Sequence, residues 1–273
     1  MVGQGTPCPT ELDVIGGSAG AIAALDVLNK VSASEHLLNA AVLCGERLLR
    51  EQQPQVRGVG LKTDVASTQP LTGFSHGAAG IAWALLKLAA WSREARFREA
   101  AKSFIAYERS TFVAEKGNWP DYRTWLEEDQ SAPRFMAAWC HGAPGIGLAR
   151  IDGLQYMDDR ETREEIEIAL RTIVESNFGM SHCLCHGDLG NLDVLLYAAQ
   201  RMDNSWWNQA GERLASETIA NIAEQGCLCS RQTSVASPGM MVGLAGIGYG
   251  LLRLASPERF PSVLVLAPPT MTQ

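Results

Sequence analysis

A short glycine motif recurs five times along the 273 residues and constrains the fold more than any other feature of the sequence. Each copy reads Gly-x-x-Gly and precedes a segment rich in Ala, Leu and Ile. The copies are Gly17–Gly20, Gly77–Gly80, Gly142–Gly145, Gly187–Gly190 and Gly243–Gly246. Their first glycines lie 45 to 65 residues apart, which leaves room for two helices and their loops in each unit. The repeat therefore predicts one domain built from a repeated helix pair.

Two kinds of helix alternate in this pattern. The segments after the glycine motifs carry few polar residues, which is typical of helices buried on nearly all sides. They are Ala21–Lys30, Ile81–Trp91, Ile146–Met157, Asn191–Met202 and Ile247–Ala255. The segments between them have one apolar face; in Arg160–Phe178, for example, Ile166, Leu170 and Ile173 recur at helical spacing. We therefore expect an all-α fold, an α/α toroid in which about five helix pairs form an inner and an outer ring.

The composition excludes several classes of protein. The net charge is −7, the isoelectric point is near 5.3, and no run of Lys or Arg is present, so nucleic acid is not expected as a partner. The longest apolar stretch, Gly80–Trp91, is shorter than the roughly 20 residues that span a bilayer, so we expect no membrane span. Residues 1–10 lack the features of a secretory signal. These observations predict a cytoplasmic protein whose seven cysteines stay reduced.

Histidine directly precedes the first glycine in three of the five motifs, at His76, His141 and His186. The chain has only five histidines, so this shared position indicates a shared function. If the inner helices begin at one end of the toroid, the residues before each motif gather there. His76 stands in a repeat without cysteine, and imidazole titrates near neutral pH. We therefore predict that His76 is a general acid or base; the alternative is a hydrogen-bonded core histidine.

Cysteine accompanies two of these histidines, at Cys140 and Cys185. Two thiolates and the imidazole of His186 would provide three protein ligands and leave a fourth position open, as in catalytic zinc sites. Sulfur donors favour zinc over magnesium, calcium or manganese. We therefore predict one Zn²⁺ at Cys140, Cys185 and His186. His182 or Cys183 could replace one of these ligands, and the other reading is that the cysteines are buried core residues.

Three segments carry a family resemblance: Gly73-Phe-Ser-His-Gly-Ala-Ala-Gly80, Trp139-Cys-His-Gly-Ala-Pro-Gly145 and Cys185-His-Gly-Asp-Leu-Gly-Asn191. They resemble the lanthionine synthetase C-like family, and are most similar to the C-terminal cyclase domain of class II lanthipeptide synthetases. The likeness extends over the chain from about Glu11. It implies zinc-dependent formation of lanthionine and methyllanthionine in a dehydrated precursor peptide, in which a cysteine thiolate adds to dehydroalanine or dehydrobutyrine.

The resemblance also implies roles for individual residues. It places Cys140, Cys185 and His186 at the zinc ligands and His76 at the active-site acid or base. Asp13 matches an acidic active-site position, and His141 is expected to support proton transfer. Some cyclases carry an arginine four residues before the first zinc cysteine. This chain has Met136 there, so no arginine role is carried over.

The number of repeats departs from the family pattern. The family toroid has about seven helix pairs, whereas this chain has five glycine motifs. We expect a disordered segment at residues 1–10, followed by a cyclase domain at residues 11–273 that is N-terminally truncated or forms a smaller, open ring. An open ring would expose apolar helices at its seam, where an upstream dehydratase domain or the missing N-terminal repeats could bind.

Two other functions remain open. The chain could be a non-catalytic or incomplete zinc-binding fragment that binds a peptide or a partner subunit. It could instead be an enzyme that adds glutathione-like thiols to dehydroamino acids. The first alternative follows from the incomplete ring, and the second from the same thiol chemistry at the zinc site.

Overall fold

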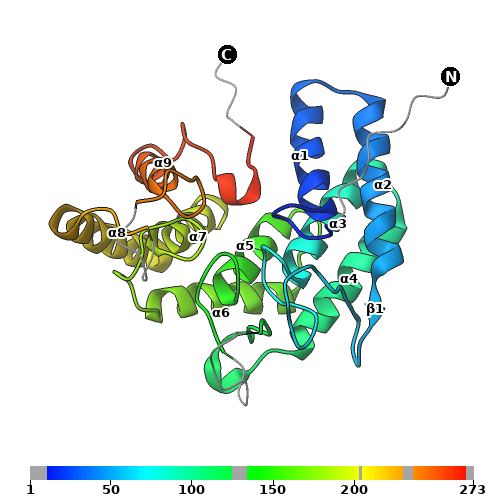
Figure 1. Cartoon of the computed structure of the whole chain (residues 1–273), viewed down its shortest axis with the longest axis horizontal. Coiled ribbons are helices and arrows are strands. Elements are labelled where there is room, and N and C mark those ends of the chain that lie inside the picture. Colours follow the sequence, from blue (N-terminus) through cyan, green and yellow to red (C-terminus); the bar gives the residue numbers. More distant parts are fainter. Residues whose placement is uncertain (1–10, 125–133, 203–204, 230–235, 269–273) are drawn as a thin grey trace.

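Helices that follow the glycine motifs form a row in which each contacts the next (Figure 1). The computed structural model describes residues 11–124, 134–202, 205–229 and 236–268; the predicted disordered segment 1–10 lies outside them. The inner helices of this part of the chain are α1 (Ser18–Val31), α3 (Ala78–Ser92), α5 (Ala143–Gly153), α7 (Asp188–Arg201) and α9 (Leu244–Ala255). Helices α3 and α5 are buried along almost their whole length. The predicted all-α fold is confirmed, but burial on nearly all sides holds for α3, α5 and α7 and not for the first and last inner helices, α1 and α9, which have few buried residues.

Amphipathic helices pack outside this row. They are α2 (Glu35–Glu51), α4 (Ala95–Ser110), α6 (Arg160–Glu175) and α8 (Ser205–Gln225), and each contacts the inner helix that precedes it. Helix α9 has no outer helix among the described residues, so these residues form four pairs and a fifth inner helix rather than five pairs. A short hairpin of β1 (Gln53–Pro54) and β2 (Val59–Gly60) follows α2. Within the described residues, no helix combines the length and the apolar character needed to cross a bilayer.

The second glycine of each motif is required by a close backbone contact. A β-carbon on Gly190 would lie 2.0 Å from the carbonyl oxygen of Leu184, far inside van der Waals contact. The equivalent carbonyl lies 1.8–2.0 Å from the β-carbon position in the other four motifs, at Gly20, Gly80, Gly145 and Gly246. The motif therefore sets one turn geometry before all five inner helices, and Gly17 and Gly243 belong to the same turns.

Backbone hydrogen bonds join these turns from one repeat to the next. The amide of Val14 donates to the carbonyl of Ser75 at 3.0 Å, and the amide of Ser75 donates to Cys140 at 3.2 Å. The amide of Cys140 donates to Cys185 at 3.2 Å, and that of Cys185 to Met241 at 2.8 Å. The residues before the glycine motifs thus lie in one continuous row across five repeats.

A buried carboxylate joins three inner helices within the core. Asp152 of α5 accepts hydrogen bonds from Trp83 Nε1 at 2.7 Å and from the Tyr197 hydroxyl at 2.5 Å, and its Oδ2 lies 2.8 Å from Lys87 Nζ. Burial alone raises the pKa of Asp152, but the charge of Lys87 and the hydrogen bonds from Lys87, Tyr197 and Trp83 together outweigh it, so the pKa lies below its ordinary value. The buried charge is therefore paired, as burial requires.

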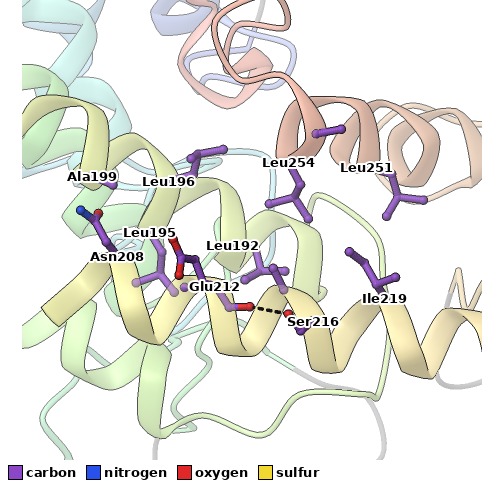
Figure 2. A pocket seen from close by; sticks show the side chains of 13 residues that line it. Leu192, Leu195, Leu196, Ala199, Asn208, Glu212, Ser216, Ile219, Leu251 and Leu254 are labelled. Atoms are coloured by element: carbon purple, nitrogen blue, oxygen red, sulfur yellow. Dashed lines mark hydrogen bonds between the residues drawn. The ribbon is translucent and has the colours of Figure 1, made fainter. Parts of the chain in front are cut away.

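An apolar groove of about 400 Å³ lies between α7, α8 and α9 (Figure 2). Leu192 and Leu195 of α7, Ile219 of α8, and Leu251 and Leu254 of α9 contribute to its walls. The outer helix α8 thus forms one wall of the groove, and the inner helices α7 and α9 form the others.

Candidate metal centre and active site

Three ligand-type side chains converge where the loops before α5 and α7 meet. The Sγ atoms of Cys140 and Cys185 and a ring nitrogen of His186 all lie within 4.8 Å of one another. Cys140 is buried, Cys185 is half-buried and His186 is exposed, so one side of the cluster faces solvent. Zinc binds sulfur at about 2.3 Å and imidazole nitrogen at about 2.0 Å, so the spacing and the donor set fit a single zinc ion.

The protonation of the cluster favours a thiolate. Hydrogen bonds with Cys185 and His186 lower the pKa of the Cys140 thiol well below its ordinary value, despite burial. The contact with Cys140 also raises the pKa of Cys185. Contacts with the sulfurs of Cys140 and Cys183 raise the pKa of His186 to about 10. Thiolate is the form in which cysteine binds a metal.

His182 and Cys183, the possible replacement ligands, have other contacts. His182 Nε2 lies 2.8 Å from Asn221 Oδ1, and its Nδ1 accepts a hydrogen bond from the Leu228 amide at 3.0 Å. Both ring nitrogens thus hold neighbouring segments together. Cys183 is fully buried and hydrogen-bonds with the ring and the amide of His186. Cys183 therefore lies beside a candidate ligand, but its sulfur is not one of the three clustered ligand atoms.

His76 and Asp13 form a second pair in the same row of loops. His76 Nδ1 lies 2.5 Å from Asp13 Oδ2, and the Gly16 amide donates to Asp13 Oδ1 at 2.9 Å. Burial raises the pKa of Asp13, but the hydrogen bonds from His76 and Gly16 outweigh it, so the pKa is lower than usual. Asp13 is therefore ionised at neutral pH and orients the imidazole. An imidazole held through Nδ1 presents Nε2 for proton exchange.

His141 connects the His76 pair to the cysteine cluster. Its ring stacks on His76 with 5.8 Å between centroids, and it directly follows Cys140 in the chain. It is 1% exposed, and neither ring nitrogen has a hydrogen-bond partner among the described residues. Burial lowers the pKa of His141 to about 4, so the ring is neutral at neutral pH.

Arg123 was not identified from the sequence. Its guanidinium pairs with Asp121, with 2.6 Å between Nη2 and Oδ2, and donates to Met136 Sδ at 2.9 Å. Its charge also interacts with His141 and Cys185. A cation therefore lies beside Met136, the position at which some cyclases carry arginine. No sequence signal marks Arg123, because it lies outside the glycine motifs.

Comparisons with known proteins find relatives that match most of the chain. Residues 4–265 match the family model described as lanthionine synthetase C-like protein. The lacticin 481/lactococcin biosynthesis protein LcnDR2 of Lactococcus lactis subsp. lactis is 26% identical over 256 residues, which are 88% of this chain and 25% of that protein. The nisin biosynthesis protein NisC of the same organism is 27% identical over 133 residues, covering 45% of this chain and 31% of NisC. The chain thus spans about a quarter of the length of LcnDR2.

Solved structures share the fold. Nisin cyclase superposes with a TM-score of 0.72 at 18% identity, covering 95% of this chain and 68% of the cyclase. A sugar epimerase from a ruminal bacterium superposes with a TM-score of 0.57 at 12% identity, covering 80% of this chain and 61% of the epimerase. At these identities the likeness concerns architecture, and it confirms the predicted α/α toroid.

Proposed function

The chain belongs to the lanthionine synthetase C-like family, and we propose from this that it forms lanthionine and methyllanthionine rings in a dehydrated precursor peptide. The observation that carries the proposal is the convergence of Cys140, Cys185 and His186 beside the Asp13–His76 pair. The cyclase domain would comprise residues 11–273, and its place of action would be the cytoplasm.

Cys140, Cys185 and His186 would hold one zinc ion. When bound, zinc supplies the Lewis acidity that converts a cysteine thiol of the peptide into a thiolate at neutral pH. The exposed His186 marks the side from which a peptide reaches the cluster. The buried Cys140 keeps the opposite side dry.

The bond changes of the reaction assign proton transfer to His76. The peptide thiolate forms a bond to the β-carbon of dehydroalanine or dehydrobutyrine, and the electron pair of the carbon–carbon double bond moves into an enolate. The α-carbon then takes up one proton, which replaces the proton that the cysteine thiol lost to solvent, so the peptide mass does not change. His76 would deliver this proton, while the Asp13 carboxylate holds Nδ1 and stabilises the imidazolium. Arg123 would favour the enolate through its positive charge, and the neutral ring of His141 would support the proton transfer.

Thiol counting tests this function directly, because ring closure consumes a thiol without changing mass. A dehydrated precursor peptide is incubated with the protein, alkylated and weighed by mass spectrometry. We expect fewer alkylated cysteines with the protein than without it. A repeat with added glutathione distinguishes ring closure from intermolecular addition, since a glutathione adduct gains the mass of that thiol. Unchanged alkylation without any adduct, in protein that contains zinc, would contradict both enzymatic functions.

The apolar seam favours a second candidate function, binding of a partner polypeptide. The groove between α7, α8 and α9 is lined mainly by apolar side chains (Figure 2), and Leu28, Val31 and Leu43 of α1 and α2 are exposed to solvent. Exposed apolar surface of this kind is typical of sites that bind another polypeptide. An upstream dehydratase domain or further repeats would bind there. This candidate predicts that zinc is retained but that thioethers form only after the partner is added. Thiol counting with and without the partner distinguishes the two functions.

A further inference from the structure

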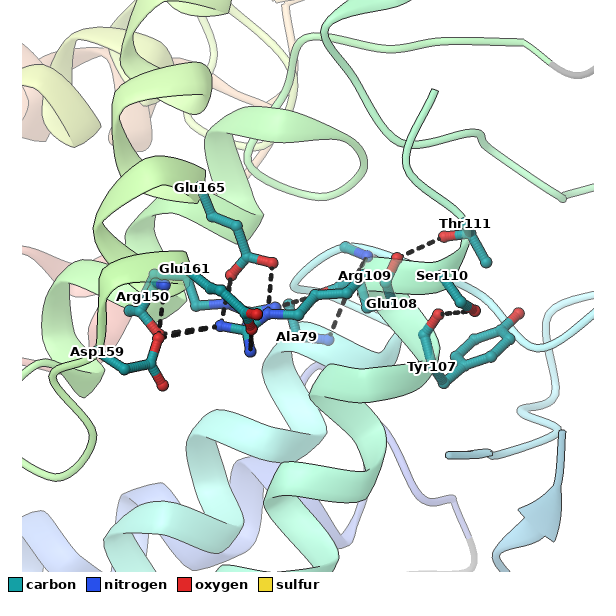
Figure 3. A network of polar contacts seen from close by, with 12 residues as sticks. Ala79, Tyr107, Glu108, Arg109, Ser110, Thr111, Arg150, Asp159, Glu161 and Glu165 are labelled. Carbon is teal, nitrogen blue, oxygen red and sulfur yellow. Dashed lines mark hydrogen bonds and ion pairs between the residues drawn. The ribbon is translucent and has the colours of Figure 1, made fainter. Parts of the chain in front are cut away.

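A buried carboxylate, that of Glu108, is hydrogen-bonded to the loop that carries His76; Figure 3 shows Glu108 near Ala79 at the end of this loop. Glu108 is near the end of the outer helix α4, and its side chain has no exposed surface. Its Oε1 accepts hydrogen bonds from the amides of Gly73 at 3.0 Å and Ala79 at 3.1 Å. These amides stand on either side of His76. The Ala79 amide is also one of the first-turn donors of α3 that the helix itself cannot satisfy.

The other oxygen of Glu108 belongs to an ion network. Oε2 accepts a hydrogen bond from Arg150 Nη2 at 2.8 Å, and Arg150 Nε donates to Glu165 Oε2 at 2.7 Å (Figure 3). Arg150 is 3% exposed, so it needs anionic partners. Glu108 and Glu165 share this task, but only Glu108 is hydrogen-bonded to the His76 loop.

Residues 73–79 also pack against the loop that carries Cys140, one of the candidate metal ligands. A β-carbon on Gly73 would lie 2.9 Å from the carbonyl oxygen of Cys140 and 3.0 Å from the Cα atom of His141, and the φ angle of Gly73 is +91°. Ser75 donates to the Cys140 carbonyl from its amide and from its Oγ, both at 3.2 Å. The position of residues 73–79 therefore determines how far His76 lies from the cysteine cluster.

We propose that Glu108 is a positioning residue that holds His76 at its working distance from the cluster by fixing both ends of its loop. This role rests on the proposed function, because it serves proton transfer by His76. A carboxylate oxygen that accepts two amide protons forms charge-assisted hydrogen bonds with defined directions, whereas an apolar side chain would only fill the space. Arg150 balances the buried charge.

Two substitutions separate the loop contact from the ion pair. Glu108→Asp keeps the charge but shortens the side chain by one methylene, so it cannot reach both amides and Arg150. Glu108→Gln keeps the length and an acceptor oxygen but loses the charge. Glu165→Gln and Glu165→Asp are the matched controls, since they alter the same arginine without touching the loop. We measure kcat, KM, zinc content and amide hydrogen exchange of residues 73–79 in all four variants.

We expect Glu108→Asp to lower kcat about 10- to 100-fold with little change in KM or zinc content, because a misplacement of about 1 Å has this effect on catalysis. Amide exchange at Gly73 or Ala79 should accelerate in the same variant. Both Glu165 variants should retain most of kcat and the slow exchange, and Glu108→Gln should fall between them and Glu108→Asp, because its oxygen can still accept from the two amides while its NH2 group cannot pair with Arg150. The opposite order, with Gln worse than Asp or the Glu165 variants equal to Glu108→Asp, would overturn the proposal in favour of a purely ionic role. If the native protein forms no thioether, the proposed function fails, while the exchange data still decide whether Glu108 holds the loop.

Discussion

The amide of Cys140 donates a hydrogen bond to the carbonyl of Cys185 at 3.2 Å, although the two residues belong to different repeats. The bond lies within the row that runs from Val14 to Met241, so five turns support it. It keeps the loops of the two sulfur donors together through the backbone. Metal binding therefore does not have to assemble the site, and this leads to the first prediction.

Removal of one thiolate should remove the metal and leave the fold. We expect about one zinc per chain in the native protein and nearly none in Cys185→Ala, because two remaining ligands bind zinc weakly. Elemental analysis measures the zinc, and circular dichroism should be unchanged. Cys227→Ala is the control, since Cys227 is exposed and outside the cluster. A folded native protein without zinc would contradict the assignment.

Cys183 should affect zinc affinity indirectly, through its contact with His186. Partners of a metal-binding histidine typically change metal affinity about 10- to 100-fold, so Cys183→Ala should weaken zinc binding by this amount. Cys183→Ser should do less harm, because its hydroxyl can still hydrogen-bond with the ring. Competition with a chromophoric chelator measures the affinity. Equal affinities in all three proteins would show that the contact between Cys183 and His186 has no effect on the metal.

His76→Ala should separate chemistry from metal binding. Loss of a general acid typically lowers kcat about 10²- to 10⁴-fold, and zinc content should stay at the native level. Asp13→Asn should lower kcat less, because it removes the carboxylate 2.5 Å from Nδ1 but leaves the imidazole. Thiol counting over time gives the rates. His36→Ala is the control, since His36 is an exposed residue of α2. Native rates in His76→Ala would exclude its role as the proton donor.

We predict opposite effects on stability for two Gly→Ala substitutions, one at the second glycine of a motif and one inside a helix. In Gly190→Ala the new β-carbon would meet the Leu184 carbonyl oxygen at 2.0 Å, so we expect a loss of about 1–3 kcal/mol in unfolding free energy. Gly248 lies inside α9 with no atom within 4 Å of a β-carbon, so Gly248→Ala should gain up to about 1 kcal/mol from helix propensity. Urea unfolding measures both. A tolerated Gly190→Ala would show that the turn can shift.

The buried ion pair of Asp152 and Lys87 predicts that the stability difference between Asp152→Asn and the native protein depends on pH. The pKa of Asp152 in the folded protein lies below its ordinary value of 3.8, so its contribution is present above that pH and is lost as the pH falls through the folded pKa. Asp152→Asn should cost about 3–5 kcal/mol at pH 7, because Lys87 is left buried without its partner. The difference from the native protein should shrink below about pH 4. Asp158→Asn, in an exposed pair with Arg163, should change stability little. A difference that does not vary with pH would contradict the assignment.

The helices were predictable because their signals are local. Apolar spacing and the glycine motifs identify inner and outer helices, and most boundaries agree within a few residues. The exception is the segment Ile146–Met157, where α5 ends at Gly153. The Tyr156 and Met157 amides turn back to the Gly153 carbonyl there, which spacing alone does not indicate.

The glycine repeat, the turn before each inner helix and the residue types in these turns could be predicted from the sequence, because they depend on neighbours along the chain. The three-dimensional fold determines which of these residues contact one another. It brings Cys185 rather than Cys183 into the cluster, places Asp13 on the His76 ring, and sets Glu108 of an outer helix against that loop. These relationships depend on backbone hydrogen bonds and packing between repeats far apart in the chain, and no local periodicity records them.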